Sequence, residues 1–244
     1  MIESRLIDLG SVMHVLPIFR WLNIVLWGTR IQRKTMRTRI KICGITRIED
    51  AKTAVDAGAD AIGLVFYAKS PRYVTVEQAR LICQCVPAFV QCVGLFVNQD
   101  AALVQSIYQQ AGLSLVQYHG QESATWCDLV GLPYIKAIRV KDALSAKQGL
   151  ADYPNAKAIL MDTYVDGVAG GTGEVFDWTC LPKQSERAVI LAGGLDAGNV
   201  HRAIQLVNPY AVDVSSGVED APGQKAHDKI REFIKGVSDV DNKR

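Results

Sequence analysis

Cys43 stands at the carboxyl end of a short apolar strand candidate, Ile40–Cys43, and a glycine follows it directly. Enzymes built from alternating strands and helices usually keep a nucleophile or a base at such a position. Asp162 follows directly on a second apolar run, Ala158–Met161, where a charged group is costly in a core but reasonable at a mouth open to solvent. Taken alone, Asp162 fits a helix cap or a structural ion pair equally well. These two residues suggest thiol chemistry and acid–base chemistry.

Glycine and serine residues follow the last two strand candidates, in the segments Leu191–Leu195 and Val214–Val218. Glycines let the backbone approach an anion closely, and serine hydroxyls together with free amides can surround its oxygens. Loops after strands seven and eight of a barrel tend to bind phosphate, so the two segments together predict a phosphate site, whereas either alone would fit an ordinary turn. The residues expected to hold the phosphate are Gly193, Gly194, Ser215, Ser216 and Gly217.

Three further features lie next to strand candidates. Arg72 follows a proline and could fork onto a carboxylate, although an isolated arginine is more often a surface residue. His119 follows the fourth strand candidate, and a structural histidine is its alternative interpretation. Four glycines between positions 167 and 173, Gly171 among them, favour a loop that folds over the mouth and keeps water from reactive intermediates. A long surface loop is the alternative.

Short apolar runs alternate with helical patterns from Arg39 onward. The strand candidates are Ile40–Cys43, Ala61–Phe66, Gln91–Phe96, Leu115–Tyr118, Ile135–Ile138, Ala158–Met161, Ala188–Ala192 and Ala211–Val214. The helical candidates are Glu49–Ala57, Val76–Cys85, Ala101–Ala111, Glu122–Leu129, Ala143–Gly149, Asp177–Cys180, Asn199–Leu206 and Lys225–Gly236. Thr46 and Glu49 have the spacing of a capping box at the start of the first helix.

Eight strands alternating with helices, without a long linker, predict an α/β fold, a single-domain (βα)8 TIM barrel. A doubly wound open sheet is the alternative. Such a sheet would more naturally show a glycine-rich dinucleotide turn after its first strand, and Gly44 alone is no such fingerprint. The barrel is therefore the favoured architecture.

Length and charge are those of one ordinary globular domain. The chain has 244 residues with 27 basic against 25 acidic side chains, and no basic field points to nucleic acid. Its six cysteines show neither zinc-ligand spacing nor the density of a disulfide scaffold, and they fit a reducing cytoplasm. Five are interpreted as small core residues, with Cys43 as the exception. The sequence shows no metal or nucleotide site, so no cofactor is expected.

Residues 1–38 do not belong to the repeat. The apolar stretch Val12–Trp27 is too short and too interrupted for a good membrane-spanning helix, and the features of a secretory signal are not evident. We interpret these residues as an upstream extension or a mis-called start, with an interfacial amphipathic anchor as the alternative. The barrel is expected over residues 39–238, beginning near Met36, and residues 239–244 are expected to form a C-terminal tail.

From Arg39 to Lys235 the chain resembles phosphoribosylanthranilate isomerase, a cofactor-free enzyme family of tryptophan biosynthesis. Any one matching segment would be weak, but the ordered set is specific and covers nearly all of the chain outside the leader. The segments are KICGIT at 41–46, GLVFYAKSPRY at 63–73, VGLFVN at 93–98, VQYHG at 116–120, LMDT at 160–163, GGTG at 170–173, LAGGL at 191–195 and VDVSSGVE at 212–219.

The resemblance implies an aldose–ketose isomerase that performs an Amadori rearrangement of N-(5-phosphoribosyl)anthranilate. In that match Asp162 is the general acid and Cys43 the general base. Arg72 holds the anthranilate carboxylate, and the residues of the two glycine- and serine-rich segments hold the phosphate. The expected substrate-binding residues are Arg72, His119, Gly171 and Asp213. An acid raised in pKa by partial burial suits ring opening, and a thiolate suits removal of a proton from carbon.

Lys41 and Asp213 are expected to form an ion pair inside the barrel. Lys41 shares a strand face with Cys43, and Asp213 lies on strand eight, which becomes the neighbour of strand one when a barrel closes. A lone ammonium would be costly there. Lys41 would also place positive charge near Cys43 and favour its thiolate.

Other phosphosugar barrels are the main rivals. An indole-glycerol-phosphate synthase would need a lysine general acid on an early strand, and a histidine-pathway isomerase an aspartate in place of Cys43. A non-catalytic phosphate-binding barrel is a third alternative. The expected partner is a small phosphosugar–anthranilate substrate in the cytoplasm, with neither nucleic acid nor membrane. The one macromolecular partner that the pathway suggests is a neighbouring tryptophan-pathway enzyme.

Overall fold

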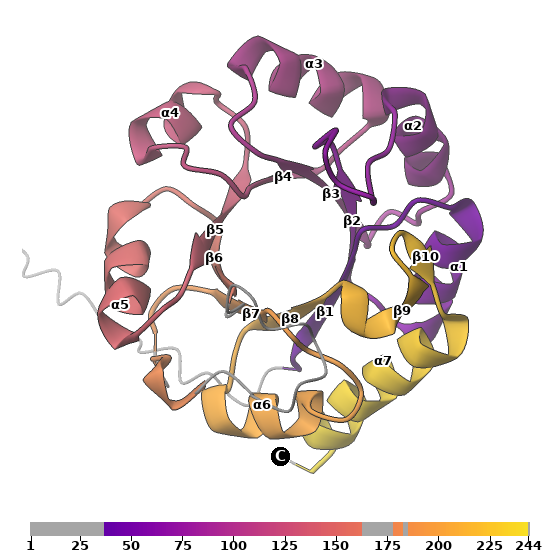
Figure 1. Ribbon diagram of the computed structural model, residues 1–244, viewed down its shortest axis with the longest axis vertical. Coiled ribbons are helices and arrows are strands. Elements are labelled where there is room, and N and C mark those ends of the chain that lie inside the picture. The colour runs from indigo at the N-terminus through magenta and orange to yellow at the C-terminus, as the bar shows by residue number, and fades with distance from the viewer. Residues whose placement is uncertain (1–36, 163–177, 183–184, 244) are drawn as a thin grey trace, which may run out of the picture. The chain divides into compact units, whose positions relative to one another are not determined.

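The computed structural model describes residues 37–162, 178–182 and 185–243, and its centre is a closed eight-stranded parallel barrel with the strands in sequence order. Helices surround the ring of strands (Figure 1). The predicted (βα)8 barrel is confirmed, and the doubly wound alternative is wrong. The strands are β1 (Arg39–Cys43), β2 (Ala61–Val65), β3 (Gln91–Phe96), β4 (Leu115–Tyr118), β5 (Tyr134–Arg139), β6 (Ala158–Asp162), β7 (Val189–Ala192) and β8 (Ala211–Val214).

The helices follow the predicted order with shifts at their ends. They are α1 (Ile48–Ala57), α2 (Val76–Gln84), α3 (Ala101–Ala111), α4 (Ala124–Leu129), α5 (Ala143–Asp152), α6 (Val200–Val207) and α7 (His227–Asp241). The sixth predicted helix is a single 3-10 turn, Trp178–Cys180, and its first residue, 177, lies outside the described residues.

The predicted capping box at Thr46 and Glu49 is wrong. The N-cap of α1 is Arg47, which makes no side-chain cap hydrogen bond. The Thr46 hydroxyl instead donates to the Gly223 carbonyl at 2.6 Å. A tertiary contact therefore takes the hydroxyl that local spacing assigned to the helix. A capping box does form at the start of α2, between Thr75 and Gln78.

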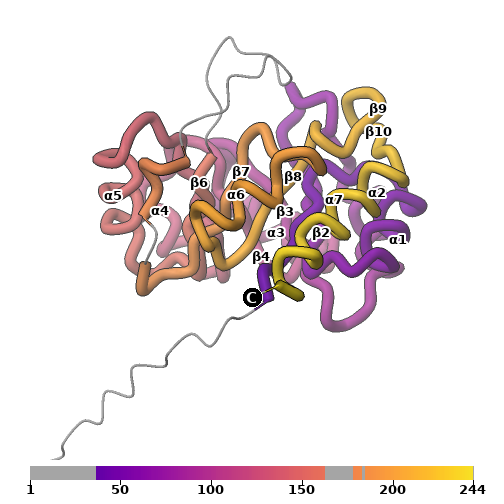
Figure 2. The backbone as a smooth tube through the Cα atoms, turned by 90° about the horizontal axis from the view of Figure 1, so that it is seen from below, coloured from indigo at the N-terminus to yellow at the C-terminus, as the bar shows by residue number. Residues whose placement is uncertain are grey.

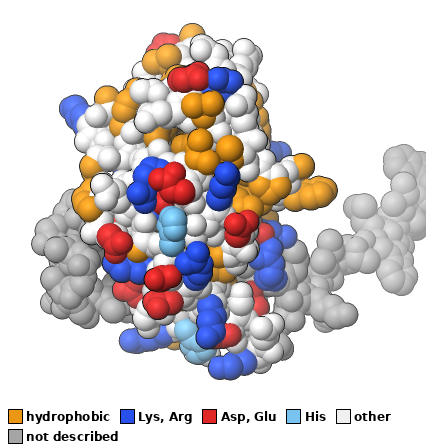
Figure 3. All heavy atoms as spheres, turned by 90° about the vertical axis from the view of Figure 1, so that its right-hand side faces the viewer, with side chains coloured by type: hydrophobic (Ala, Val, Ile, Leu, Met, Phe, Trp, Pro, Cys, Tyr) orange, Lys and Arg blue, Asp and Glu red, His pale blue; other side chains and the backbone are white. Residues whose placement is uncertain are grey.

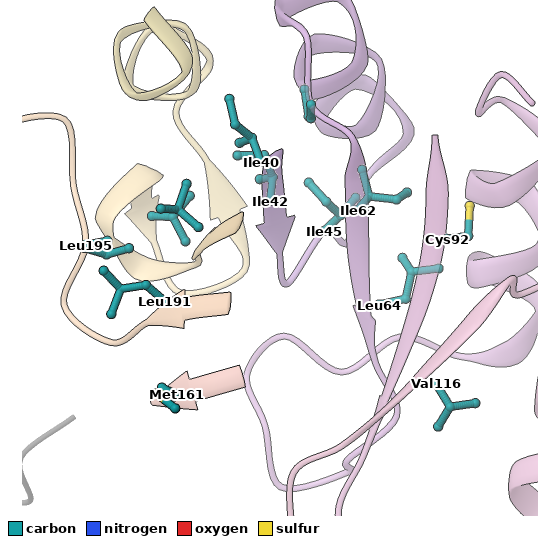
Figure 4. Close-up of a cluster of buried hydrophobic side chains, with 14 of the residues drawn as sticks. Ile40, Ile42, Ile45, Ile62, Leu64, Cys92, Val116, Met161, Leu191 and Leu195 are labelled. Carbon is teal, nitrogen blue, oxygen red and sulfur yellow. The ribbon is translucent and has the colours of Figure 1, made fainter. Parts of the chain in front are cut away.

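Two layers of apolar side chains fill the molecule. Inside the ring lie residues such as Leu160 and Ile190. Outside it, residues such as Ile40 and Ile42 pack between the strands and the helices (Figure 4). Because side chains alternate along a strand, burying Ile40 and Ile42 outside turns Lys41 and Cys43 toward the barrel axis. The predicted division of β1 into two faces is confirmed.

The chain after β8 has a feature that the sequence reading missed. An antiparallel hairpin of β9 (Glu219–Ala221) and β10 (Gln224–Lys225) precedes α7. Lys225 therefore lies in a strand, and the predicted start of the last helix is wrong by two residues. The hairpin packs beside the barrel mouth and carries charged side chains toward it.

The last helix is longer than expected and includes residues 239–241 of the predicted tail. Asp241 accepts hydrogen bonds from the Thr38 backbone nitrogen at 2.7 Å and the Thr38 hydroxyl at 3.0 Å. Figure 2 shows the end of α7 beside the start of β1. These contacts tie the two ends of the barrel sequence together. Residues 1–36 lie outside the described residues, so the predicted boundary near Met36 stays a prediction.

The six cysteines are all free. Cys92 and Cys127 are buried, whereas Cys83 and Cys180 are half-buried. Cys85, at the C-cap of α2, is exposed, so its interpretation as a core residue is wrong. The described surface mixes both charge signs, as the face in Figure 3 shows.

Candidate active site

A cavity of about 310 Å³ opens at the carboxyl ends of the strands. Its size is in the range of small-molecule sites. Most of the predicted site residues line it, namely Cys43, Arg72, His119, Asp162, Gly193, Gly194, Asp213, Ser215 and Ser216. Gly217 does not line the cavity, and Gly171 lies outside the described residues. The predicted site residues meet at one mouth because each lies at or after the carboxyl end of a strand, and the parallel strands all end at that face of the barrel.

Lys41 and Asp213 form the predicted ion pair inside the barrel. The two residues are register partners between β1 and β8, and Lys41 Nζ lies 2.8 Å from Asp213 Oδ1. Their side chains are only 4% and 9% exposed. Burial opposes the charge of Lys41, but the Asp213 carboxylate and the Cys43 sulfur outweigh it and raise the lysine pKa. The ammonium is therefore retained beside Cys43.

Cys43 is buried against this pair at the end of β1. Burial raises the pKa of its thiol, and Lys41 opposes that shift without reversing it. The expectation that Lys41 favours the thiolate is confirmed in sign, but burial outweighs the effect, which the sequence could not reveal. A Cβ atom on Gly63 of β2 would come within 2.8 Å of the Cys43 sulfur. Glycine at position 63 thus leaves the room that the sulfur occupies.

Asp162 ends β6 and meets His119, which follows β4. His119 Nε2 lies 3.3 Å from Asp162 Oδ2. On the other side of the ring, the Gln117 side-chain amide donates to His119 Nδ1 at 3.0 Å. Because Nδ1 accepts that bond, the ring hydrogen of a neutral His119 lies on Nε2 and points toward Asp162. Gln117, which sequence reasoning missed, therefore sets the orientation of the histidine.

The loops after β7 and β8 cross at close range beside the cavity. Gly193 and Gly194 have φ values of 89° and 62°, a region that favours glycine. A Cβ atom on Gly217 would lie 1.9 Å from the Leu195 carbonyl oxygen, so only a glycine allows this crossing. Gly217 is not in the cavity wall. It shapes the predicted phosphate loops by letting their backbones pack closely.

Arg72 reaches the mouth because the loop after β2 folds back on its strand, with a parallel bridge between Val65 and Tyr73. Its guanidinium forms a two-point contact with Glu219 of the β9–β10 hairpin. Glu219 and its partner Lys225 were missed as site residues. Glu219 ends the segment VDVSSGVE, but nothing in the sequence pattern shows that the hairpin turns it toward Arg72.

Within the described residues, no group of three or more His, Cys, Asp or Glu side chains is placed to hold a metal ion. Likewise, no helix of the described ranges is long and apolar enough to cross a membrane.

Comparison with known proteins gives one consistent family. Residues 40–236 match the family model described as N-(5′-phosphoribosyl)anthranilate isomerase. A protein of that name from Pseudomonas fluorescens is 56% identical over 199 residues, which cover 82% of this chain and 98% of the relative.

Solved structures agree. A phosphoribosyl anthranilate isomerase from Thermotoga maritima superposes with a TM-score of 0.76 at 41% identity, covering 83% of this chain and 99% of the other. A phosphoribosyl anthranilate isomerase solved in complex with reduced 1-(o-carboxyphenylamino)-1-deoxyribulose 5-phosphate has a TM-score of 0.72 at 39% identity, with coverage of 83% and 99%.

Proposed function

The chain belongs to the N-(5′-phosphoribosyl)anthranilate isomerase family, and on that premise we propose that it converts N-(5′-phosphoribosyl)anthranilate into 1-(2-carboxyphenylamino)-1-deoxyribulose 5-phosphate in tryptophan biosynthesis. One observation carries the proposal. Cys43 at the end of β1 and Asp162 at the end of β6 line the same cavity, next to the glycine- and serine-rich loops of β7 and β8. A thiol, a carboxyl group and an anion site thereby surround a space suited to one phosphosugar.

Asp162 is the general acid of the first step. In its protonated form it gives a proton to the ribose ring oxygen, and the bond between that oxygen and C1′ breaks. The lone pair of the anthranilate nitrogen forms the C1′=N bond, which leaves a cationic imine. The Nε2 hydrogen of His119 faces Asp162 Oδ2, so His119 orients the carboxyl group and stabilises the carboxylate that the step produces.

Cys43 is the general base of the second step. Its thiolate takes the proton from C2′, the electrons of that C–H bond form the C1′=C2′ bond, and the imine π electrons return to nitrogen. The resulting enolamine tautomerises to the ketone product. Burial disfavours the thiolate, whereas the cationic imine and the Lys41 ammonium both favour it. One proton returned from the thiol to Asp162 through solvent resets the pair.

The remaining groups bind the substrate. Arg72 binds the anthranilate carboxylate, for which a guanidinium fork is well suited. The phosphate is held by the loops after β7 and β8, where Gly193, Gly194, Ser215 and Ser216 line the cavity and Gly217 allows their close crossing. Asp213 lines the cavity and pairs with Lys41. Gly171 stays a prediction, as part of a loop that closes over the substrate. We propose that the reaction takes place in the cytoplasm, and we expect it to need no cofactor or metal.

A fluorescence assay tests the proposed activity, since turnover removes the anthranilate adduct. The purified full-length chain should isomerise N-(5′-phosphoribosyl)anthranilate, and it should restore growth without tryptophan to a strain that lacks this isomerase. A chain shortened to begin at Met36 should do the same if the leader lies outside the barrel. Phosphosugar binding without turnover would favour a non-catalytic barrel, and turnover only of another phosphosugar would favour one of the rival enzymes.

A further inference from the structure

Arg72 is held from one edge of its guanidinium. Its Nε donates to Glu219 Oε1 at 2.8 Å and its Nη2 donates to Glu219 Oε2 at 2.6 Å. A guanidinium has five N–H donors in a planar fork, so this contact uses two of them. The donors left are both hydrogens of Nη1 and one of Nη2, and one hydrogen from each of these nitrogens forms the other edge. Arg72 is a wall residue of the cavity, and its side chain is 23% exposed.

Glu219 is itself fixed by a buried lysine. Lys225 Nζ lies 2.7 Å from Glu219 Oε1 and also donates to the Ser215 carbonyl at 3.0 Å. The side chains of Glu219 and Lys225 are 4% and 0% exposed. Burial alone would raise the pKa of Glu219, but the hydrogen bonds from Arg72 and Lys225 outweigh it and lower the pKa. Burial lowers the pKa of Lys225, and the Glu219 carboxylate opposes that shift. Glu219 is thus a carboxylate held between two basic side chains.

We propose that Glu219, held by Lys225, is a positioning residue that fixes Arg72 so that its second edge receives the carboxylate of the substrate. The inference rests on the proposed function, because it needs a substrate that carries a carboxylate. A free arginine side chain has many rotamers and loses their entropy on binding. Here the contact with Glu219 orders Arg72 through the protein's own side chains, so substrate binding costs less.

Glu219→Gln tests the proposal. The amide offers one oxygen where the carboxylate offers two, and its NH2 group would face a donor of Arg72 or of Lys225, so the fork is broken. Two probes are compared by titration. One is reduced 1-(2-carboxyphenylamino)-1-deoxyribulose 5-phosphate, and the other is its phenylamino counterpart without the carboxyl group. We expect Glu219→Gln to lower the affinity for the carboxylate probe about 10-fold, the scale of a charge-assisted hydrogen bond. The affinity for the phenyl probe should fall less than about 2-fold.

A second comparison asks whether Glu219 acts through Arg72. In an Arg72→Ala background, Glu219→Gln should cause no further loss of affinity for the carboxylate probe, because the residue it positions is gone. Arg72→Lys serves if Glu219→Gln fails to fold. Lysine keeps a charge beside Glu219 but has no second edge of donors. The Arg72→Lys variant should therefore lose the same roughly 10-fold in affinity for the carboxylate probe.

Glu77→Gln is the matched control for the loss of an arginine–carboxylate fork as such. Glu77 accepts the same kind of fork from Arg80, at 3.1 and 2.7 Å. Neither residue of that pair is in the cavity wall. Glu77→Gln should leave the unfolding midpoint nearly unchanged and both probe affinities unchanged.

Equal weakening of both probes by Glu219→Gln would overturn the proposal, because Glu219 would then support the mouth in general. Unchanged affinity for the carboxylate probe would overturn it as well, as would wild-type affinity in Arg72→Lys. Turnover by the wild-type chain is measured in parallel. If the wild type fails to turn over, the proposed function is wrong; if it turns over and the variants bind as the wild type does, only the role of Glu219 is wrong.

Discussion

Replacing Lys41 by methionine removes one half of the buried ion pair in the barrel. Methionine fills a similar volume without charge, so the main effect falls on Asp213. That carboxylate is 9% exposed and its partner nitrogen lies 2.8 Å away. Without the ammonium it would sit in the barrel as an unpaired charge or take up a proton, and either outcome is costly.

Removing one partner of a buried pair typically costs about 3–5 kcal/mol. For a domain of this size, each kcal/mol lowers the midpoint of thermal unfolding by roughly 2–4 °C, so Lys41→Met should lower it by roughly 6–20 °C. The double variant Lys41→Met/Asp213→Asn removes both charges at little change in shape. It should recover part of the loss, because no buried charge is left unpaired.

Urea and thermal unfolding measure these changes, and the chain supplies a matched control. Arg80 and Glu77 form a pair at 2.7 Å, but their side chains are 42% and 65% exposed. Arg80→Met should leave the unfolding midpoint nearly unchanged, because water screens an exposed pair. A shift of the midpoint for Lys41→Met as small as that of this control would refute the view that burial makes the inner pair strongly coupled.

Three further predictions concern binding and the thiol. Arg72→Ala should raise KM for N-(5′-phosphoribosyl)anthranilate about 10-fold or more, through loss of a charge-assisted contact, with a smaller effect on kcat; an unchanged KM would rule out the carboxylate contact. Gly217→Ala should weaken inhibition by inorganic phosphate, because the new Cβ would displace the Leu195 carbonyl; unaltered inhibition would mean that the crossing does not shape the anion site. Alkylation of Cys43 should accelerate with rising pH through a pKa above the ordinary 9.0 of a thiol, and Lys41→Met should move that midpoint higher still. Because the Cys43 pKa is raised in the folded state, the folded state favours the protonated thiol. The free energy of unfolding therefore falls as pH rises above the thiol pKa of the unfolded chain. Mass spectrometry follows the rate of alkylation. A midpoint of its pH dependence at or below pH 9.0 would contradict the burial of Cys43.

The barrel and the inner ion pair could be predicted from the sequence because both follow from simple geometry. Strand alternation has a period of two, so Lys41 had to share the face of Cys43, and closure of the ring had to bring β8 beside β1. The register then sets Lys41 opposite Asp213. Nothing beyond apolar patterning and strand order is needed for that inference.

The missed features depend on tertiary contacts that no local pattern encodes. The hydroxyl of Thr46 leaves its expected cap because the hairpin brings the Gly223 carbonyl within 2.6 Å. Glu219 meets Arg72 although 147 positions separate them in the chain. The net pKa shift of Cys43 depends on how deeply the sulfur is buried, and spacing alone gives only the sign of the Lys41 effect.

The acid–base assignment is tested most directly by kcat in Cys43→Ser and Asp162→Asn, measured side by side in the fluorescence assay with the fold of each variant verified by circular dichroism. Serine cannot supply a thiolate, and asparagine cannot donate the proton that opens the ring. Each variant should lose about 100-fold or more in kcat. Turnover near the wild-type rate in either folded variant would contradict a mechanism in which these two side chains act on the same sugar.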